Sequence, residues 1–546
     1  MWAVALKKSA LPKGDPFQSG GGTTRLVSTG WIVWAKAPDK FEAGTPSIIN
    51  VIAFARALQF IEKYGKGSFN HKEEGTLTAK QLLYDDKLFQ FSGIELLNEF
   101  RKTEIGRNIK VPTTEGLKQF INLDNGASTP AFTPVWEAAY NSWQLPESTR
   151  KEIIIEVKSI CSDFLGASEN NYDFIFTSNT TEAVNLIAEC LGKEQEQDIE
   201  PVVINTILEH NSNDLPWRML PGISHLRLDT DSEGFLDLNK LDILLSEYNL
   251  KSLHGKKRIR IMAITGASNV LGTFNDLAEI SRIVHKYGVR LLVDGAQLIA
   301  HRKIAVEEYG IDYLVFSAHK VYAPFGTGLL VARKGKLNFD NSELQLIESS
   351  GEENICGIAA LGKSLLILNR IGLDLIHSEE QLLTRRALSG LSGVEGIQVY
   401  GITDPDSERF SRRGGVIAFN FTKIFSHTVA KELADRGGIG IRFGCHCAHV
   451  LVKWLLNVPP WLEKFQKVMV TVFPGVQLPG VARISIGIEN TESDIDSLVE
   501  GLHKIKRDKD KKQESDKEDV SMISKKDIRK QIEEFIAAAA GRVYSE

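Results

Sequence analysis

Between residues 120 and 293, short apolar runs alternate with stretches of helical periodicity. Strands are predicted over residues 173–177, 201–205, 258–263 and 289–293, and helices over residues 181–190 and 276–287. Strands that alternate with helices in this way are typical of a mostly parallel sheet with helices on both faces. The sequence therefore predicts an α/β fold, with a large domain over residues 118–390.

A smaller α/β pattern follows the large one. It consists of a helical stretch over residues 357–390, a strand over 416–421, a helix over 427–435 and a strand over 482–486. We assign a small C-terminal domain to residues 391–505. We expect the remaining residues, 506–546, to form a charged, solvated tail with a short helix near residues 526–539.

The first 117 residues fit neither domain. Alternating apolar residues over 26–34 predict a hairpin or an edge strand, and residues 48–63, preceded by a Gly-Thr-Pro sequence, predict an amphipathic helix. One hairpin and one helix, within residues 1–68, are too few elements to form a core of their own. We interpret residues 69–117 as a linker with one or two helical patches that packs on the outside.

Composition limits the functional classes. With 546 residues, 42% hydrophobic and 25% charged, the chain can bury a large core. A net charge of -5 and a pI near 6.2 give no electrostatic basis for a nucleic-acid partner. The five cysteines are scattered apart from one close pair, which is not the pattern of a disulfide framework. Because we find no signal peptide and no apolar run of bilayer length, we expect no membrane partner and a cytoplasmic location.

Polar residues follow two predicted strands that are neighbours in the sequence. They are Asp294 and Gln297 after residues 291–293, and Ser317, His319 and Lys320 after residues 313–316. Ligand sites of α/β proteins lie at this edge of the sheet, where a buried lysine has a lowered amine pKa and can form a Schiff base. An isolated Ser-Ala-His-Lys sequence is more typical of a surface lysine. Because a carboxylate follows the preceding strand, and such a group keeps the ring nitrogen of pyridoxal phosphate protonated, we predict a site for that cofactor.

Three further loops carry groups that suit the same cofactor. They contain Thr180 and Thr181 between a strand and a helix, His210 past a strand end, and Asn269 near the same edge. Hydroxyls at a helix N-terminus bind phosphate, an imidazole can stack on a planar ring and move protons, and an amide can bond to the ring oxygen. Each group alone is more often structural, as a helix cap or a loop residue. Their occurrence together with Lys320 and Asp294 favours the cofactor site.

These motifs resemble those of the class V aminotransferase family, and within it the branch of cysteine desulfurases and selenocysteine lyases. The resemblance extends from about Leu123 to Leu502. It is carried by Asp294-Gly-Ala-Gln297, Ser317-Ala-His-Lys320, Thr180-Thr181, Glu209-His210 with Asn213 and Pro216-Trp217, and Asn269-Val-Leu-Gly272.

The resemblance implies a fold of the aspartate-aminotransferase type (pyridoxal-phosphate fold type I), normally found as a homodimer. It also implies that Lys320 forms the Schiff base with the cofactor, that Asp294 pairs with the ring nitrogen and that Gln297 bonds to the phenolic oxygen. By the same resemblance His210 stacks on the ring. The remaining cofactor-binding positions are Thr180, Thr181, Asn269, Ser317 and His319, of which Thr181, Ser317 and His319 hold the phosphate.

A cysteine-containing sequence, Cys445-His-Cys447-Ala-His449, follows Arg442. An arginine nearby favours the thiolate form of a cysteine, which supports a reactive thiol. An inert structural pair and a metal site remain as alternatives, although the basic Arg442 disfavours a cation and we expect no metal. In the desulfurase branch, Cys447 falls at the position of the cysteine that forms a persulfide. The resemblance makes Arg483 the residue that binds the substrate α-carboxylate, and it makes Asn125 and Arg442 further substrate-binding residues.

Three features depart from the family pattern. Glu352 stands where the family has a threonine that binds the phosphate of the partner subunit. Residues 20–58 resemble that same family segment, with Phe41-Glu-Ala-Gly-Thr45-Pro intact, which suggests a tandem duplication with a truncated first copy. This copy either docks at the dimer interface beside an active site, where Thr45 could bind phosphate, or is a remnant that packs loosely on the outside or on its own partner copy. Residues 451–479 are longer and more aromatic than the desulfurase pattern.

From these observations we expect a pyridoxal-phosphate enzyme that cleaves L-cysteine to alanine and an enzyme persulfide. A homodimer and a sulfur-acceptor protein are the expected partners. Transamination, epimerisation or a C–S β-lyase reaction is the alternative within the family. A non-catalytic scaffold is the alternative outside enzymes, although a scaffold needs none of Lys320, Asp294, His210 or Arg483.

Overall fold

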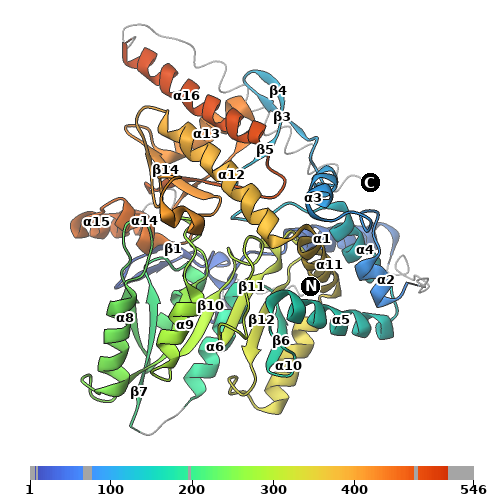
Figure 1. Ribbon diagram of the computed structural model, residues 1–546, viewed down its shortest axis with the longest axis vertical. Coiled ribbons are helices and arrows are strands. Elements are labelled where there is room, and N and C mark those ends of the chain that lie inside the picture. Colours follow the sequence, from blue (N-terminus) through green and yellow to red (C-terminus); the bar gives the residue numbers. More distant parts are fainter. Residues whose placement is uncertain (1–6, 8–9, 66–76, 195–197, 473–477, 515–546) are drawn as a thin grey trace.

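A seven-stranded sheet forms the centre of the large domain (Figure 1). The computed structural model describes residues 7, 10–65, 77–194, 198–472 and 478–514. In spatial order the strands are β6 (Tyr172–Thr177), β12 (Gly328–Arg333), β11 (Tyr313–Ser317), β10 (Arg290–Asp294), β9 (Lys257–Thr265), β7 (Glu200–Thr206) and β8 (Ser224–Leu228). β12 runs antiparallel to both of its neighbours, and all other pairs are parallel. The predicted mostly parallel sheet is confirmed.

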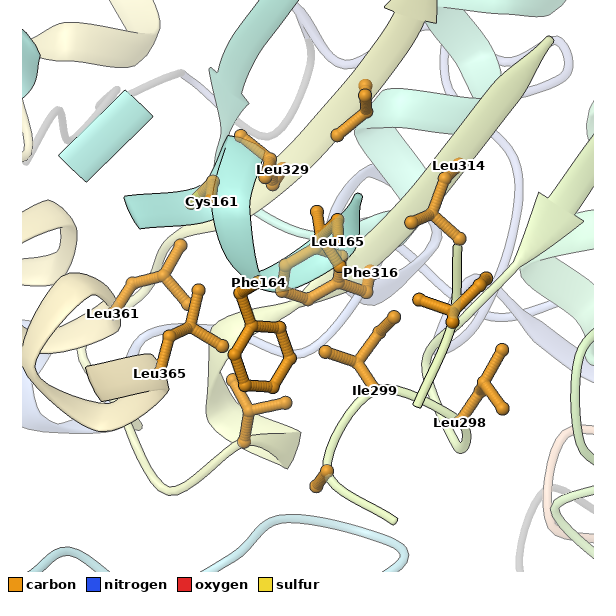
Figure 2. Packing of buried hydrophobic residues seen from close by; sticks show 14 of the residues in the cluster. Cys161, Phe164, Leu165, Leu298, Ile299, Leu314, Phe316, Leu329, Leu361 and Leu365 are labelled. Atoms are coloured by element: carbon orange, nitrogen blue, oxygen red, sulfur yellow. The ribbon is translucent and has the colours of Figure 1, made fainter. Parts of the chain in front are cut away.

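Alternate side chains of the central strands pack on opposite faces of this sheet, because successive residues of a strand point to opposite sides. Leu314 and Phe316 of β11 belong to one buried cluster, and Tyr313 and Val315 to another. Figure 2 shows the first face, where the sheet packs on α5 (Glu147–Leu165) and α11 (Ile355–Ile371) through Leu314, Phe316, Leu329, Phe164, Leu165, Leu361 and Leu365. Strands buried on both faces account for the near-continuous apolar runs in the sequence.

Other helices complete the large domain. They are α4 (Thr133–Ser142), α6 (Thr180–Lys193), α7 (Leu215–Met219), α8 (Leu238–Leu245), α9 (Leu277–His285) and α10 (Asn341–Glu352). α12 (Leu373–Ser392) begins at the large domain through Ile376 and then packs in the core of the small domain through Leu383, Leu388 and Leu391. The single helical stretch predicted over residues 357–390 is two helices, α11 and α12. Gly372 separates them with a φ of +94°, a conformation that residues with a Cβ rarely adopt, and this turn breaks the helix.

The small domain contains a four-stranded antiparallel sheet and lies above the large sheet in Figure 1. Its strands, in spatial order, are β13 (Ile397–Val399), β14 (Val416–Phe421), β17 (Val481–Ser485) and β16 (Arg442–Gly444). Its helices are α13 (Ser426–Gly437), α14 (His449–Leu455), α15 (Pro460–Val472) and α16 (Glu492–Glu514). β15 (Ile439–Gly440) pairs with β5 (Ile121–Asn122), which connects this domain to the start of the large one. The helix predicted near residues 526–539 lies outside the described residues, as does Phe473 of the aromatic stretch.

The expectation that residues 69–117 pack on the outside is wrong for the two helices in this stretch, α2 (Ala79–Tyr84) and α3 (Gly93–Lys102). Leu83, Leu96 and Phe100 are buried in the core of the large domain, and the ring of Phe100 stacks on that of Phe132 with centroids 4.0 Å apart. The apolar stripe of such a short helix shows that the helix packs on something but does not identify the partner. β3 (Lys110–Thr113) and β4 (Gly116–Gln119) follow as a hairpin.

The N-terminal part forms the hairpin of β1 (Thr24–Val27) and β2 (Ile32–Trp34), followed by helix α1 (Ile48–Tyr64), as the sequence predicts. In Figure 1 the hairpin lies between α14 and α15 of the small domain and the large sheet. Among the described residues no single helix is long and apolar enough to cross a membrane. The bent pair of α10 and α11, at 76° to each other, meets that test by length and composition alone.

Candidate active site

A cavity of about 390 Å³ lies at the carboxyl ends of β9, β10 and β11. All of the predicted site residues except Asn125 line it: Thr180, Thr181, His210, Asn269, Asp294, Gln297, Ser317, His319, Lys320, Arg442, Cys447 and Arg483. Asn125 is buried beside the cavity, where its amide nitrogen lies 3.3 Å from the carbonyl oxygen of Ser485 and 3.2 Å from Oδ1 of Asn490. The volume is in the range of small-molecule and cofactor sites.

Lys320 and Asp294 lie at the ends of adjacent strands. Asp294 ends β10 and is in register with Val315 of β11, and Lys320 follows β11 in a short 3-10 turn, Ala318–Lys320. Desolvation lowers the pKa of Lys320 to about 8, against the opposing effect of the Asp294 charge. Burial raises the pKa of Asp294. A hydrogen bond from the backbone N–H of Ala296 and the positive charge of Lys320 partly offset this rise. The lowered pKa makes Lys320 a better nucleophile near neutral pH.

Hydroxyl groups gather at the N-terminus of α6, on one side of the cavity. The backbone N–H of Thr180 donates to Oγ of Ser317 at 2.7 Å, and the two side-chain oxygens are also 2.7 Å apart. Oγ1 of Thr181 lies 2.6 Å from Oγ of Ser212. Nδ1 of His319 is buried without a hydrogen-bond partner among the described residues. The positive end of a helix dipole surrounded by hydroxyls suits a phosphate group.

The imidazole of His210 is held in the uncharged form. Its Nδ1 accepts a hydrogen bond from the backbone N–H of Ser212 at 3.1 Å, which leaves the ring proton on Nε2. Burial, together with the charges of Lys320 and Arg483, lowers the pKa of His210 well below its usual value. The preceding residue, Glu209, holds the loop that carries His210 in place, because its carboxyl oxygens accept hydrogen bonds from the side chains of Thr206 and Asn213. A neutral ring in this position can stack on a planar ligand.

Two arginines, Arg442 and Arg483, also line the cavity. Arg483 donates to Oδ1 of Asp124 at 2.7 Å and to the carbonyl of Asn269 at 3.0 Å. Arg442 lies 3.4 Å from the other oxygen of the same carboxylate. Asp124 is a site residue that the sequence reasoning missed, although it lies one position before Asn125. Two guanidinium groups that share one carboxylate leave a net positive charge, which suits the carboxylate of an amino acid.

The two neighbouring cysteines occupy different environments. Cys447 lines the cavity, whereas Cys445 packs against the apolar cluster around Leu271 and Val481, and burial raises the pKa of the Cys445 thiol to about 11. His446 and Cys447 both adopt left-handed backbone conformations, with φ values of +50° and +53°, which turns the chain between the two thiols. Among the described residues, no group of three or more His, Cys, Asp or Glu residues is arranged to hold a metal ion.

Glu352, the acidic residue in place of the family threonine, is not among the residues that line the cavity. It ends α10 and forms an ion pair with Lys158 of α5 at 2.8 Å. Gly21, Gly22, Gly44 and Thr45 of the N-terminal part do line the cavity. Of these, only Thr45 was weighed from the sequence.

Comparisons with known proteins point to one family. The family model described as aminotransferase class-V matches residues 3–112 and 121–498. A probable cysteine desulfurase of Halalkalibacterium halodurans is 34% identical over 365 residues, which are 63% of this chain and 80% of the relative. A cysteine desulfurase of Dickeya dadantii is 33% identical over 375 residues, which are 64% of this chain and 81% of the relative. The crystal structure of a cysteine desulfurase of Escherichia coli superimposes with a TM-score of 0.57 at 22% identity, covering 75% of this chain and 98% of that one. The similarity of the structures confirms the predicted fold class.

Proposed function

Because the chain belongs to the class V aminotransferase family, we propose that it is a pyridoxal-phosphate enzyme with cysteine desulfurase-type activity. It cleaves the C–S bond of L-cysteine, forms alanine and keeps the sulfur as a persulfide on Cys447. The observation that carries this proposal is that Cys447 lines the same cavity as Lys320 and the two arginines. A sulfur-acceptor protein receives the sulfur from the enzyme.

The residues of the cavity fit the cofactor that the family uses. The hydroxyls of Thr180, Thr181 and Ser317 at the start of α6 would hold the phosphate, together with Nδ1 of His319. Asp294 would pair with the ring nitrogen. The amide nitrogen of Asn269 donates to the carbonyl of His446 at 2.9 Å and that of Gln297 to the carbonyl of Gly126 at 2.8 Å, and each keeps a second N–H for the ring oxygen. Bound pyridoxal phosphate supplies an electron sink that stabilises negative charge at the substrate Cα.

The side chains of this chain then perform the remaining tasks. Arg483, assisted by Arg442, binds the substrate carboxylate and fixes its orientation. Lys320, with its lowered pKa, holds and returns the proton at the substrate Cα. His210 stays uncharged and covers the ring.

Cys447 carries out the sulfur chemistry. Its thiolate forms a bond to the substrate sulfur while the bond between that sulfur and Cβ breaks, and the electron pair of the broken bond goes to Cβ, which takes up a proton. The products are alanine and a persulfide, and no external oxidant or reductant is consumed. The second cysteine, Cys445, packs against the apolar cluster, is not among the residues that line the cavity and does not take part.

Product analysis tests the proposal against the other reactions of the family. The purified protein, loaded with pyridoxal phosphate and incubated with L-cysteine, should release alanine in a one-to-one ratio to sulfur recovered after addition of a thiol. Pyruvate and ammonia would instead indicate a β-lyase, D-cysteine an epimerase, and mercaptopyruvate a transaminase. A protein that binds pyridoxal phosphate and forms none of these products from any amino acid would be a non-catalytic scaffold.

A further inference from the structure

We propose that the N-terminal segment, defined here as residues 19–47, forms one wall of the active site of its own chain, so that a single polypeptide builds the complete site. The identity of the bound ligand rests on the proposed function, whereas the docking of the segment does not. Two loops of the segment reach the cavity, one at Gly21 and Gly22 and one at Gly44 and Thr45. They come from a part of the chain that precedes the large domain.

The first loop contacts the imidazole. A Cβ atom at Gly21 would lie 2.9 Å from Cε1 of His210, so a side chain at this position cannot fit without displacing the ring. The backbone N–H of Gly21 donates to Oγ of Ser212 at 3.4 Å. That oxygen also lies 2.9 Å from Nδ1 of His210 and 2.6 Å from Oγ1 of Thr181. The segment therefore contacts the imidazole of His210 and also the hydroxyl of Ser212, which connects that imidazole to Thr181 at the start of α6.

The second loop reaches the start of α6. Gly44 adopts a φ of +88°, and a Cβ there would lie 2.5 Å from the side chain of Asn179. Asn179 is the N-cap of α6, and its amide nitrogen donates to the carbonyl of Ala43 at 3.4 Å. The N–H of Gly44 donates to the carbonyl of Gly21 at 2.9 Å, which joins the two loops. The next residue, Thr45, lines the cavity, and its exposed hydroxyl can donate a hydrogen bond to a phosphate.

The segment is anchored well beyond the cavity. Leu26 and Val27 are completely buried, and Nζ of Lys453 donates to the carbonyl of Val27 at 2.9 Å. Ser19 and Asn185 exchange two hydrogen bonds, of 3.2 and 2.9 Å. The alternative of a remnant packed loosely on the outside is wrong for this segment, because a loosely packed hairpin would not bury its apolar strand or pair its backbone with side chains of the large domain.

A crosslink that needs neither cofactor nor substrate tests which chain the segment belongs to. Arg218 donates to the carbonyl of Thr29 at 3.3 Å, and neither residue lines the cavity. The variant Thr29→Cys/Arg218→Cys, treated with a short bismaleimide, should give a crosslinked species that migrates as one chain on a denaturing gel. The single variants Thr29→Cys and Arg218→Cys control for the native cysteines. A crosslinked dimer would show that the segment docks on a second copy, and the absence of any crosslink would show that it does not dock here. Either result overturns the proposal.

The role of the wall is tested by a matched pair of glycine variants. Gly21→Val should weaken pyridoxal-phosphate binding at least tenfold, measured by equilibrium dialysis, while Gly30→Val should leave it unchanged, since a Cβ at Gly30 has no atom within 4 Å. Equal affinities of the two variants for pyridoxal phosphate would contradict the proposal that the N-terminal segment forms a wall of the site. If the parent protein binds no pyridoxal phosphate at all, the proposed function fails, and the crosslink alone then decides the docking.

Discussion

The backbone carbonyl of Cys447 accepts a hydrogen bond of 2.7 Å from the backbone N–H of Asn211, the residue after His210. This bond joins the cysteine turn of the small domain to the histidine loop of the large domain. Together with the left-handed conformations of His446 and Cys447, it holds Cys447 at the cavity and directs Cys445 into the apolar cluster behind it. The distinction between the two thiols is therefore a property of the backbone.

The two cysteines should respond differently to substitution. Cys447→Ser should lower the rate of alanine formation from L-cysteine by roughly a thousandfold or more, because the nucleophile is lost. The variant should keep the visible absorption of the bound cofactor. Cys445→Ser is the matched control and should stay within a few-fold of the parent. Equal losses in both variants would contradict the assignment of the reactive thiol.

Lys320 should be the point of covalent attachment of the cofactor. Reduction of the loaded protein with borohydride should fix pyridoxal phosphate to the peptide that contains Lys320, as detected by mass spectrometry. Lys320→Ala should abolish this product, and Lys303→Ala, which removes an exposed lysine outside the cavity, should not. Attachment at any other lysine would refute the role of Lys320.

The rate of cofactor uptake should depend on pH through the Lys320 amine. Because the pKa of Lys320 is lowered to about 8, the reactive uncharged amine increases as the pH rises and reaches its plateau above that value. In stopped-flow measurements on the apo protein, the uptake rate should rise through a midpoint near 8. A midpoint near the ordinary lysine pKa of about 10.4 would show that the cavity does not desolvate this amine.

Arg483 should act on substrate affinity. Arg483→Lys removes the fork that binds a carboxylate through two hydrogen bonds, so the KM for L-cysteine should rise by about ten- to hundredfold, which corresponds to roughly 1.5–3 kcal/mol. Arg409→Lys, an exposed arginine paired with Asp231 and Glu233, is the control and should leave KM unchanged. A fall in kcat with no change in KM would contradict a substrate-binding role.

Glu489 should make the protein less stable at alkaline pH. Burial, with the charge of Glu104 adding to it, raises the pKa of Glu489 in the folded protein to about 8 from the model-compound value of 4.5. The folded state therefore retains a proton that the unfolded state loses, and the free energy of unfolding falls as the pH rises from about 4.5 to about 8. In Glu489→Gln this decrease in the free energy of unfolding should be smaller by a few kcal/mol. Urea unfolding curves measured at several pH values between about 4.5 and about 8 would show the difference. Exposed Glu500→Gln should leave the slope as it is.

Much of the site could be predicted from the sequence because the carboxyl ends of neighbouring parallel strands meet at one edge. This rule brings Asp294 and Lys320 together without knowledge of the rest of the fold. Asn125 belongs to the right loop, yet its side chain bonds to Ser485 and Asn490, and the adjacent Asp124 faces the arginines instead. Which of two adjacent polar side chains faces the arginines depends on the local backbone, which periodicity does not specify.

The contacts that the sequence reasoning missed are long-range ones. Gly21 lies nearly two hundred residues before His210, and no local pattern indicates that these residues touch. The same holds for α2 and α3, whose apolar stripes pack on the core of a domain that begins later in the chain. Gly372 could have been recognised as a helix break, since a glycine inside a long helical pattern is a common C-terminal signal.

The central claim is that Cys447 receives sulfur from L-cysteine, and peptide mass spectrometry of the intact thiols tests it most directly. After brief incubation of the loaded protein with L-cysteine and alkylation, the peptide that contains Cys445 and Cys447 should gain the mass of one sulfur atom, with fragment ions that place it on Cys447. The gain should be absent from Cys447→Ser and retained in Cys445→Ser. Alanine formation without any persulfide on Cys447, or a persulfide on Cys445 alone, would contradict the account.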